Sequence, residues 1–112
     1  MEKTITLQIG NSDDKLTQRK WSLFCEDITE LISGYTKTIH FSAPSIGCMP
    51  WQNYCIVFNM DTRYYVETLK ALISRMAKEY EQDSIAWTEG TTEFIEAYKE
   101  LDEILENMDS MN

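Results

Sequence analysis

The chain has 112 residues, of which 43% are hydrophobic and 26% charged, as expected for one globular domain with a single core. Its net charge of −9 excludes sequence-independent binding to nucleic acid, because counterion release requires a basic surface. No apolar run approaches the roughly 18 residues of a membrane span, and the N-terminus shows no export signal. We therefore expect a single cytoplasmic domain spanning residues 1–112, with no nucleic-acid or membrane partner.

The first third of the chain predicts a strand followed by a helix. Residues 4–9 alternate polar and apolar side chains, the pattern of a half-buried strand, and residues 10–14 form a turn. Thr17 is positioned to cap a helix over 17–33, and Gly34 to end it in the left-handed conformation. The buried stripe of this helix consists of Trp21, Phe24, Cys25, Ile28, Leu31, Ile32 and Tyr35.

The middle of the chain predicts two strands joined by a long loop. Residues 38–41 alternate like a short strand, whereas residues 42–53 contain both prolines and a glycine and are expected to be a loop or irregular hairpin. Residues 54–60 are almost continuously apolar, which is typical of a central strand.

Another helix and strand follow. Asp61 or Thr62 is expected to cap a helix over 63–80, and residues 84–88 form a fourth strand closed by Gly90. The predicted buried face of this helix consists of Val66, Leu69, Leu72, Ile73, Met76 and Tyr80.

The last part of the chain is acidic. Residues 81–112 contain ten Asp or Glu against Lys99 alone, whereas the charges of residues 1–80 cancel. Thr91 or Thr92 is expected to cap a third helix over 91–108, outside the core of residues 1–90. Its apolar residues have heptad-like spacing and form a seam that must dock on the body or on a second copy: Phe94, Tyr98, Leu101, Leu105 and Met108.

This order of elements predicts an α+β fold, a ferredoxin-like βαββαβ sandwich with an added acidic C-terminal helix. Right-handed crossovers place two helices on one face of a four-stranded antiparallel sheet, with strands one and three central. The alternative is a β-α-β-β meander with helices on both faces. The open sheet face is expected to be small and polar, formed by Thr4, Thr6, Gln8, Thr38, His40, Ser84, Ala86 and Thr88.

The junction over residues 79–87 (EYEQDSIAW) and the opening strand and turn over residues 5–14 resemble short uncharacterised α+β proteins of phages and mobile elements. The resemblance covers about a fifth of the chain and brings no catalytic residue with it. It implies an accessory or host-interaction role rather than metabolism.

The cysteines and the single histidine favour neither a disulfide framework nor a zinc site. Cys25, Cys48 and Cys55 are odd in number and lack a CxxC pair, so we expect reduced thiols, no metal and no cofactor. Cys25 and Cys55 are expected to pack as small hydrophobes. Cys48 and His40 could approach across the hairpin as a nucleophile and base. No positioning acid supports this, so we interpret them instead as an ordinary loop thiol and a solvent-facing strand histidine.

Two surfaces are candidates for binding. The segment around Met49, Trp51 and Tyr54 contains the residue types that anchor interfaces, although Trp51 could also cover one end of the core. The third helix presents Glu96, Glu100 and Glu103, which suit a basic protein partner.

We therefore predict a small non-enzymatic interaction protein, with homodimerisation through the C-terminal helix as one mode of assembly. The alternative is a small-molecule binder or simple enzyme with a pocket between the 42–53 loop and the sheet.

Overall fold

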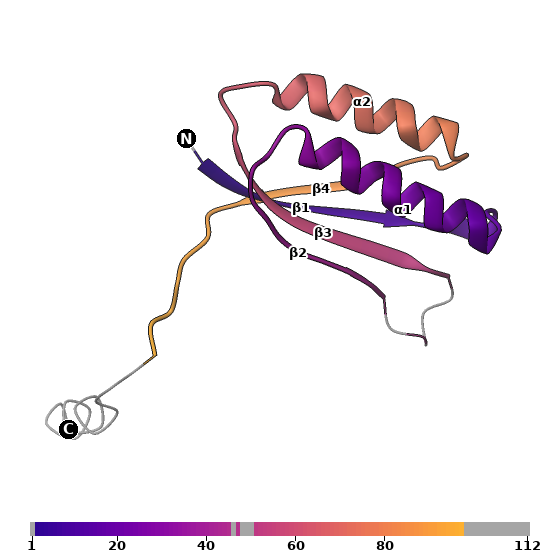
Figure 1. Ribbon diagram of the computed structural model, residues 1–112, viewed down its shortest axis with the longest axis horizontal. Coiled ribbons are helices and arrows are strands. Elements are labelled where there is room, and N and C mark those ends of the chain that lie inside the picture. Colours follow the sequence, from indigo (N-terminus) through magenta and orange to yellow (C-terminus); the bar gives the residue numbers. More distant parts are fainter. Residues whose placement is uncertain (1, 46, 48–50, 98–112) are drawn as a thin grey trace, which may run out of the picture.

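The computed structural model describes residues 2–45, 47 and 51–97. They form one antiparallel sheet with the strand order β2-β3-β1-β4, and helices α1 and α2 lie on the same side of that sheet (Figure 1). This is the predicted ferredoxin-like arrangement, and the alternative with helices on both faces is wrong. None of the helices described is long and apolar enough to cross a bilayer.

The two central strands hold the register of the sheet. β1 (Glu2–Gly10) pairs with β3 (Asn53–Asp61) along its whole length, with Ile5 opposite Phe58 and Leu7 opposite Ile56. Because side chains alternate between faces, this register puts the apolar residues of both strands on the helix side. Those residues are buried: Ile5, Leu7, Ile9, Ile56, Phe58 and Met60.

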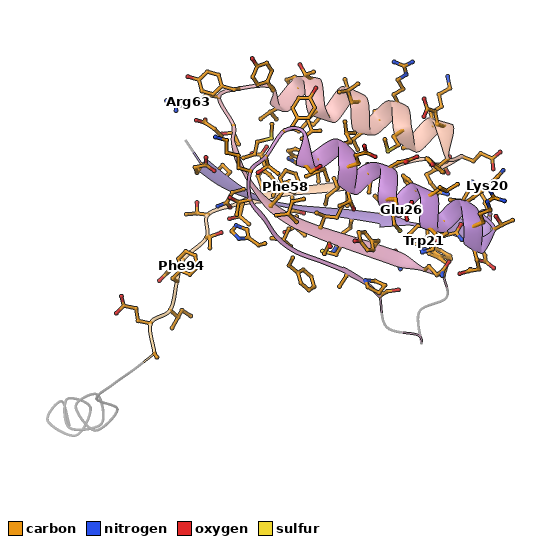
Figure 2. The ribbon with its side chains drawn as sticks, in the orientation of Figure 1. Lys20, Trp21, Glu26, Phe58, Arg63 and Phe94 are labelled. Atoms are coloured by element: carbon orange, nitrogen blue, oxygen red, sulfur yellow. The ribbon has the colours of Figure 1, made fainter. Side chains whose placement is uncertain are left out.

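The two helices cover this face with the apolar stripes that their sequences predict. α1 (Gln18–Ser33) begins after Thr17, whose hydroxyl accepts a hydrogen bond from the Lys20 N–H at 3.2 Å. Figure 2 shows Phe58 between the sheet and the helices. The buried helical residues are Trp21, Phe24, Ile28 and Ile32 in α1, and Val66, Leu69, Ile73 and Ala77 in α2 (Val66–Glu79).

Two helix ends differ from the prediction. Gly34 has φ −74°, so α1 ends without a left-handed residue. The second helix begins at Val66 rather than at residue 63, and Tyr65 precedes it with φ 59°. Asp61 does not cap this helix, because its carboxylate accepts hydrogen bonds from the backbone N–H and the guanidinium of Arg63 instead.

The turn after β1 is organised by one buried polar side chain. Asn11 is fully buried, and its amide accepts from the Leu16 N–H at 2.8 Å and donates to the Leu16 carbonyl at 3.0 Å. Its backbone N–H also donates to the carbonyl of Gln52 at 2.8 Å. Asn11 thereby joins the end of β1, the approach to α1 and the segment before β3, and its hydrogen bonds offset the cost of burying an amide.

The outer strands differ from the predicted ranges. β2 (Ile39–Pro44) runs three residues further than the predicted end at residue 41, so the connection to β3 is shorter than the predicted loop 42–53. β4 (Ala86–Gly90) starts two residues after the predicted 84. The predicted third helix does not begin at Thr91 or Thr92, because residues 91–97 contain no helix. The rest of that prediction, residues 98–108, lies outside the described residues.

Candidate functional site

The face of the sheet that the helices leave uncovered has two chemically different halves. Over β1 and β4 it carries Thr4, Thr6, Gln8, Ala86 and Thr88, as predicted. Over β2 and β3 it carries apolar groups, because an irregularity in the pairing between Ile39 and Phe41 inserts one residue and puts Phe41 opposite Val57. The expectation of a uniformly small and polar face is therefore wrong for this half.

Four apolar residues of β2 and β3 lie on the face of the sheet that the helices leave uncovered. We call them the open-face strip: Phe41, Ala43, Cys55 and Val57. The Phe41 side chain is 53% exposed, and the other three are half-buried. Ala43 lies opposite Cys55 in the β2–β3 pairing. A hollow of about 350 Å³ lies beside this strip. Phe41, Ala43 and Cys55 of the strip line it together with Gln8 and Asn53.

Four of the residues predicted to bind a partner lie in the part of the chain that the structure describes: His40, Trp51, Tyr54 and Glu96. His40 is exposed at the irregularity of β2. Tyr54 is half-buried and packs against the core, and Glu96 is exposed beyond β4. Of the remaining predicted residues other than Trp51, four lie outside the described residues, so the pairing of a thiol with His40 stays a prediction: Cys48, Met49, Glu100 and Glu103.

Trp51 is 37% exposed and lies beside the end of β1. A Cβ on Gly10 would be 2.8 Å from the Asn53 Oδ1 and 3.5 Å from the Trp51 Nε1, so a larger residue here would displace the Asn53 side chain. The neighbouring Gln52 exchanges two side-chain hydrogen bonds with Gln18, at 2.8 and 3.0 Å. These hydrogen bonds join the segment before β3 to the start of α1.

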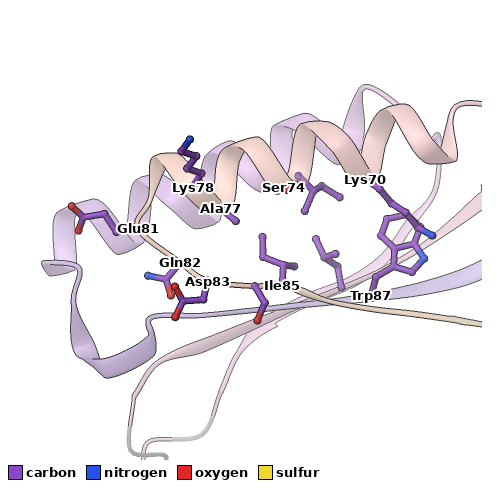
Figure 3. Close-up of a pocket in the computed structure, with 12 residues that line it drawn as sticks. Lys70, Ser74, Ala77, Lys78, Glu81, Gln82, Asp83, Ile85 and Trp87 are labelled. Carbon is purple, nitrogen blue, oxygen red and sulfur yellow. The ribbon is translucent and has the colours of Figure 1, made fainter.

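A second concave surface lies between α2 and β4, and we call it the α2–β4 groove (Figure 3). It encloses about 850 Å³, and its floor includes the buried residues Leu7, Ile73 and Ala77. The Trp87 ring meets the Phe58 ring edge to face, with centroids 6.0 Å apart. The Nζ of Lys70 lies 5.2 Å from the centroid of the Trp87 ring, a cation–π contact.

Two titratable groups on the helix side have raised pKa values. Burial raises the pKa of the Cys25 thiol from 9.0 to about 11, so this thiol is a poor nucleophile at neutral pH. Burial, together with the hydrogen bond that its hydroxyl donates to Asp27, raises the pKa of Tyr80 from 10.0 to about 12. The Tyr80 ring also stacks on Phe24 with centroids 4.6 Å apart, so Tyr80 joins the two helices.

The Asp61–Arg63 pair is the other strongly perturbed group. Hydrogen bonds from the Arg63 guanidinium, at 2.7 and 3.0 Å, hold the pKa of the Asp61 carboxyl well below its ordinary value. This pair follows β3 and stabilises the turn into α2. Across the described ranges, no group of three or more His, Cys, Asp or Glu side chains is arranged to hold a metal ion.

Comparison with known proteins supports the fold. No family model and no curated protein matches the chain. A dimeric ferredoxin-like protein of unknown function from Thermobifida fusca superposes with a TM-score of 0.55 and 8% identity, covering 81% of this chain and 92% of that one. A hydroxynitrile lyase from Passiflora edulis aligns with a TM-score of 0.39 and 11% identity, covering 86% of this chain and 96% of that one.

Sequence reasoning missed the α2–β4 groove and the apolar character of the open-face strip. The hollow at the end of the strip, in contrast, lies where the alternative prediction placed a pocket between residues 42–53 and the sheet, because Ala43, Ser45 and Asn53 line it. The open-face strip depends on the inserted residue in β2, which no local pattern marks. The α2–β4 groove depends on the spacing between a helix and the edge strand. One signal was available for the groove: Trp87 occupies a helix-facing position in the fourth strand, where a large ring beside a helix lysine can line a hollow.

Proposed function

We propose that this chain is a non-enzymatic interaction protein that assembles as a homodimer through the open-face strip. The observation that carries the proposal is the exposure of Phe41 beside Val57 on a sheet face that neither helix covers. Exposed apolar patches framed by polar residues are typical of protein contact sites, and the polar half over β1 and β4 provides such a rim. The Thermobifida protein, which is dimeric and has the same fold, supports the proposal.

The proposal accounts for the chemistry of this face better than an enzymatic function does. The thiol of the strip, Cys55, has no carboxylate, imidazole or amine among the described residues that line its hollow, whereas nucleophilic catalysis needs a base within hydrogen-bonding reach. The acidic segment after residue 90 would remain available for a basic protein partner, and added salt should weaken that contact.

The test is the mass of the full chain in solution, measured by light scattering after size-exclusion chromatography. We expect a dimer for the native chain and a monomer for Phe41→Thr, since threonine keeps strand propensity but removes the ring. The matched control is Leu23→Ser, because Leu23 is an apolar side chain 42% exposed on α1, away from the open face. This control should remain dimeric.

Two outcomes would contradict the proposal. A monomeric native chain would remove the homodimer. A Phe41→Thr variant that stays dimeric while a chain ending at Ala97 becomes monomeric would move the contact to the C-terminal segment, as the heptad-like spacing suggested.

A further inference from the structure

The α2–β4 groove has the size of a small-molecule site and an apolar floor between polar ends. Its volume of about 850 Å³ falls within the roughly 300–1,000 Å³ of ligand pockets, which are mostly apolar with a few polar groups. Ile73 and Ala77 from α2 face Leu7 of β1 across its floor, and Figure 3 shows Ile85 and Trp87 rising from the other side.

The polar groups of the groove are concentrated at its ends. In Figure 3 Lys70 reaches down to the Trp87 ring at one end, whereas Lys78 points away from the interior. Asp83 lies at the opposite end, and Ser74 is the polar residue between them on α2. The apolar part of the groove is its floor, formed by Leu7, Ile73, Ala77 and Ile85. One ammonium group lies at the end beside Trp87, whereas the other end is polar and acidic, with Glu81, Gln82, Asp83 and Ser84.

The ammonium group of Lys70 has capacity for a further acceptor. Its protein partners, Glu67 and Glu89, are each 3.9 Å away, at the outer limit of an ion pair. Glu67 is 91% exposed, so its contact contributes little. An ammonium group has three N–H donors, and a carboxylate at an ordinary distance of about 2.8 Å would form a stronger, charge-assisted bond.

We propose that the α2–β4 groove binds a small amphiphilic carboxylate, an aromatic or short aliphatic acid. Its apolar body would lie on Ile73, Ala77 and Ile85, and its carboxylate would accept a hydrogen bond from the Nζ of Lys70 beside Trp87. Seven residues separate Lys70 from Ala77, which is about 10 Å along a helix and accommodates a phenyl ring with a short chain. A cationic ligand is disfavoured because Lys70 already occupies the face of Trp87.

The test is an NMR titration of the full chain with 4-phenylbutyrate and with its neutral counterpart, 4-phenylbutanamide. The reporter is the indole N–H signal of Trp87, identified by its loss in Trp87→Phe. We expect the acid to shift this signal and to bind more tightly than the amide. Lys70→Gln should weaken binding of the acid about tenfold, the loss of one charge-assisted hydrogen bond, and leave the amide unchanged.

The matched control is Lys78→Gln, the same change two turns further along α2, and it should leave both affinities unchanged. Ser74→Trp, at an exposed position of the helix, should block the groove and abolish binding of both probes without altering the signals of the β1–β3 pair.

Four outcomes would overturn the proposal. One is equal binding of acid and amide. The second is equal behaviour of the two lysine variants. The third is the absence of a Trp87 shift at millimolar probe. The fourth is binding that survives Ser74→Trp. These measurements concern the helix side of the sheet, so they stand or fall separately from dimerisation through the open-face strip.

Discussion

The two faces of the sheet are built from neighbouring residues of the same strands, yet they place those residues in opposite environments. In β3 the Phe58 side chain is fully buried under the helices, whereas the neighbouring Val57 is half-buried on the open face. In β2 Ile39 packs against the core and Phe41 is more than half exposed. The buried core therefore lies on the helix side, and we expect substitutions there to cost more stability than substitutions on the open face.

The largest expected difference between the two faces is the stability lost on truncating one phenylalanine from each face. Phe58→Ala should lower the free energy of unfolding by about 3–5 kcal/mol, because it leaves a cavity in a packed core. Phe41→Ala should change it by less than about 1 kcal/mol at protein concentrations low enough to keep the chain monomeric. Urea denaturation of both variants measures the difference. Similar losses for the two would mean that Phe41 contributes to the core.

Two asparagines sharpen the comparison for polar groups. Asn11→Ala should cost about 2 kcal/mol, because it leaves the backbone N–H and carbonyl of Leu16 without their buried partner. Asn59 is half-buried on the open face, where its side-chain oxygen accepts a 3.1 Å hydrogen bond from Thr4. Asn59→Ala should cost less than about 1 kcal/mol, since water can replace that bond. Thermal unfolding of the two variants measures both costs, and a larger loss for Asn59→Ala than for Asn11→Ala would contradict the prediction.

The smallest effect concerns alkaline pH and is confined to the helix side. The pKa of Cys25 is about 11 against 9.0 and that of Tyr80 is about 12 against 10.0, so the folded chain keeps both protons longer than the unfolded chain. The part of the unfolding free energy that these two groups contribute should therefore be fully present below pH 9 and be lost as the pH rises through 9–12. Solvent moderates the loss because both side chains are partly exposed.

Urea titrations of the native chain at several pH values across this range would measure the decrease. A Cys25→Ala, Tyr80→Phe double variant is the control, and it should lose less stability than the native chain over the same range. An identical pH dependence in both proteins would assign the decrease to other groups.

The helix side of the sheet could be predicted because its signals are local. Ile5, Leu7 and Ile9 alternate with period two, and the stripes of α1 and α2 repeat every three or four residues, so each element declares its buried face. Thr17 likewise identified its own helix start. The late start of α2 could not be predicted, because Arg63 competes for Asp61 through a side-chain contact rather than a sequence period.

The candidate sites could not be predicted for a related reason. Whether Phe41 faces outward is decided by its pairing with Val57, a residue from another strand, and the insertion that sets this pairing leaves the alternation of residues 38–41 intact. Lys70 and Trp87 come from a helix and a strand that meet only in the folded chain. Of the predicted site residues, Trp51 and Tyr54 lie near the end of the open-face strip, and Glu96 does not.

The inserted residue in β2 separates the facing of Phe41 from strict alternation along the strand. Ile39 pairs with Phe58 on the helix side and Phe41 pairs with Val57 on the open face, so His40 lies between them outside the regular pairing. Removing His40 would make the pairing regular and leave Ile39 toward the helices and Phe41 toward solvent. A strand that kept His40 within the regular pairing would instead turn Phe41 toward the helices and remove its ring from the open-face strip. Related chains that lack this one residue could therefore keep the same contact surface, whereas chains that keep it without the irregularity could not.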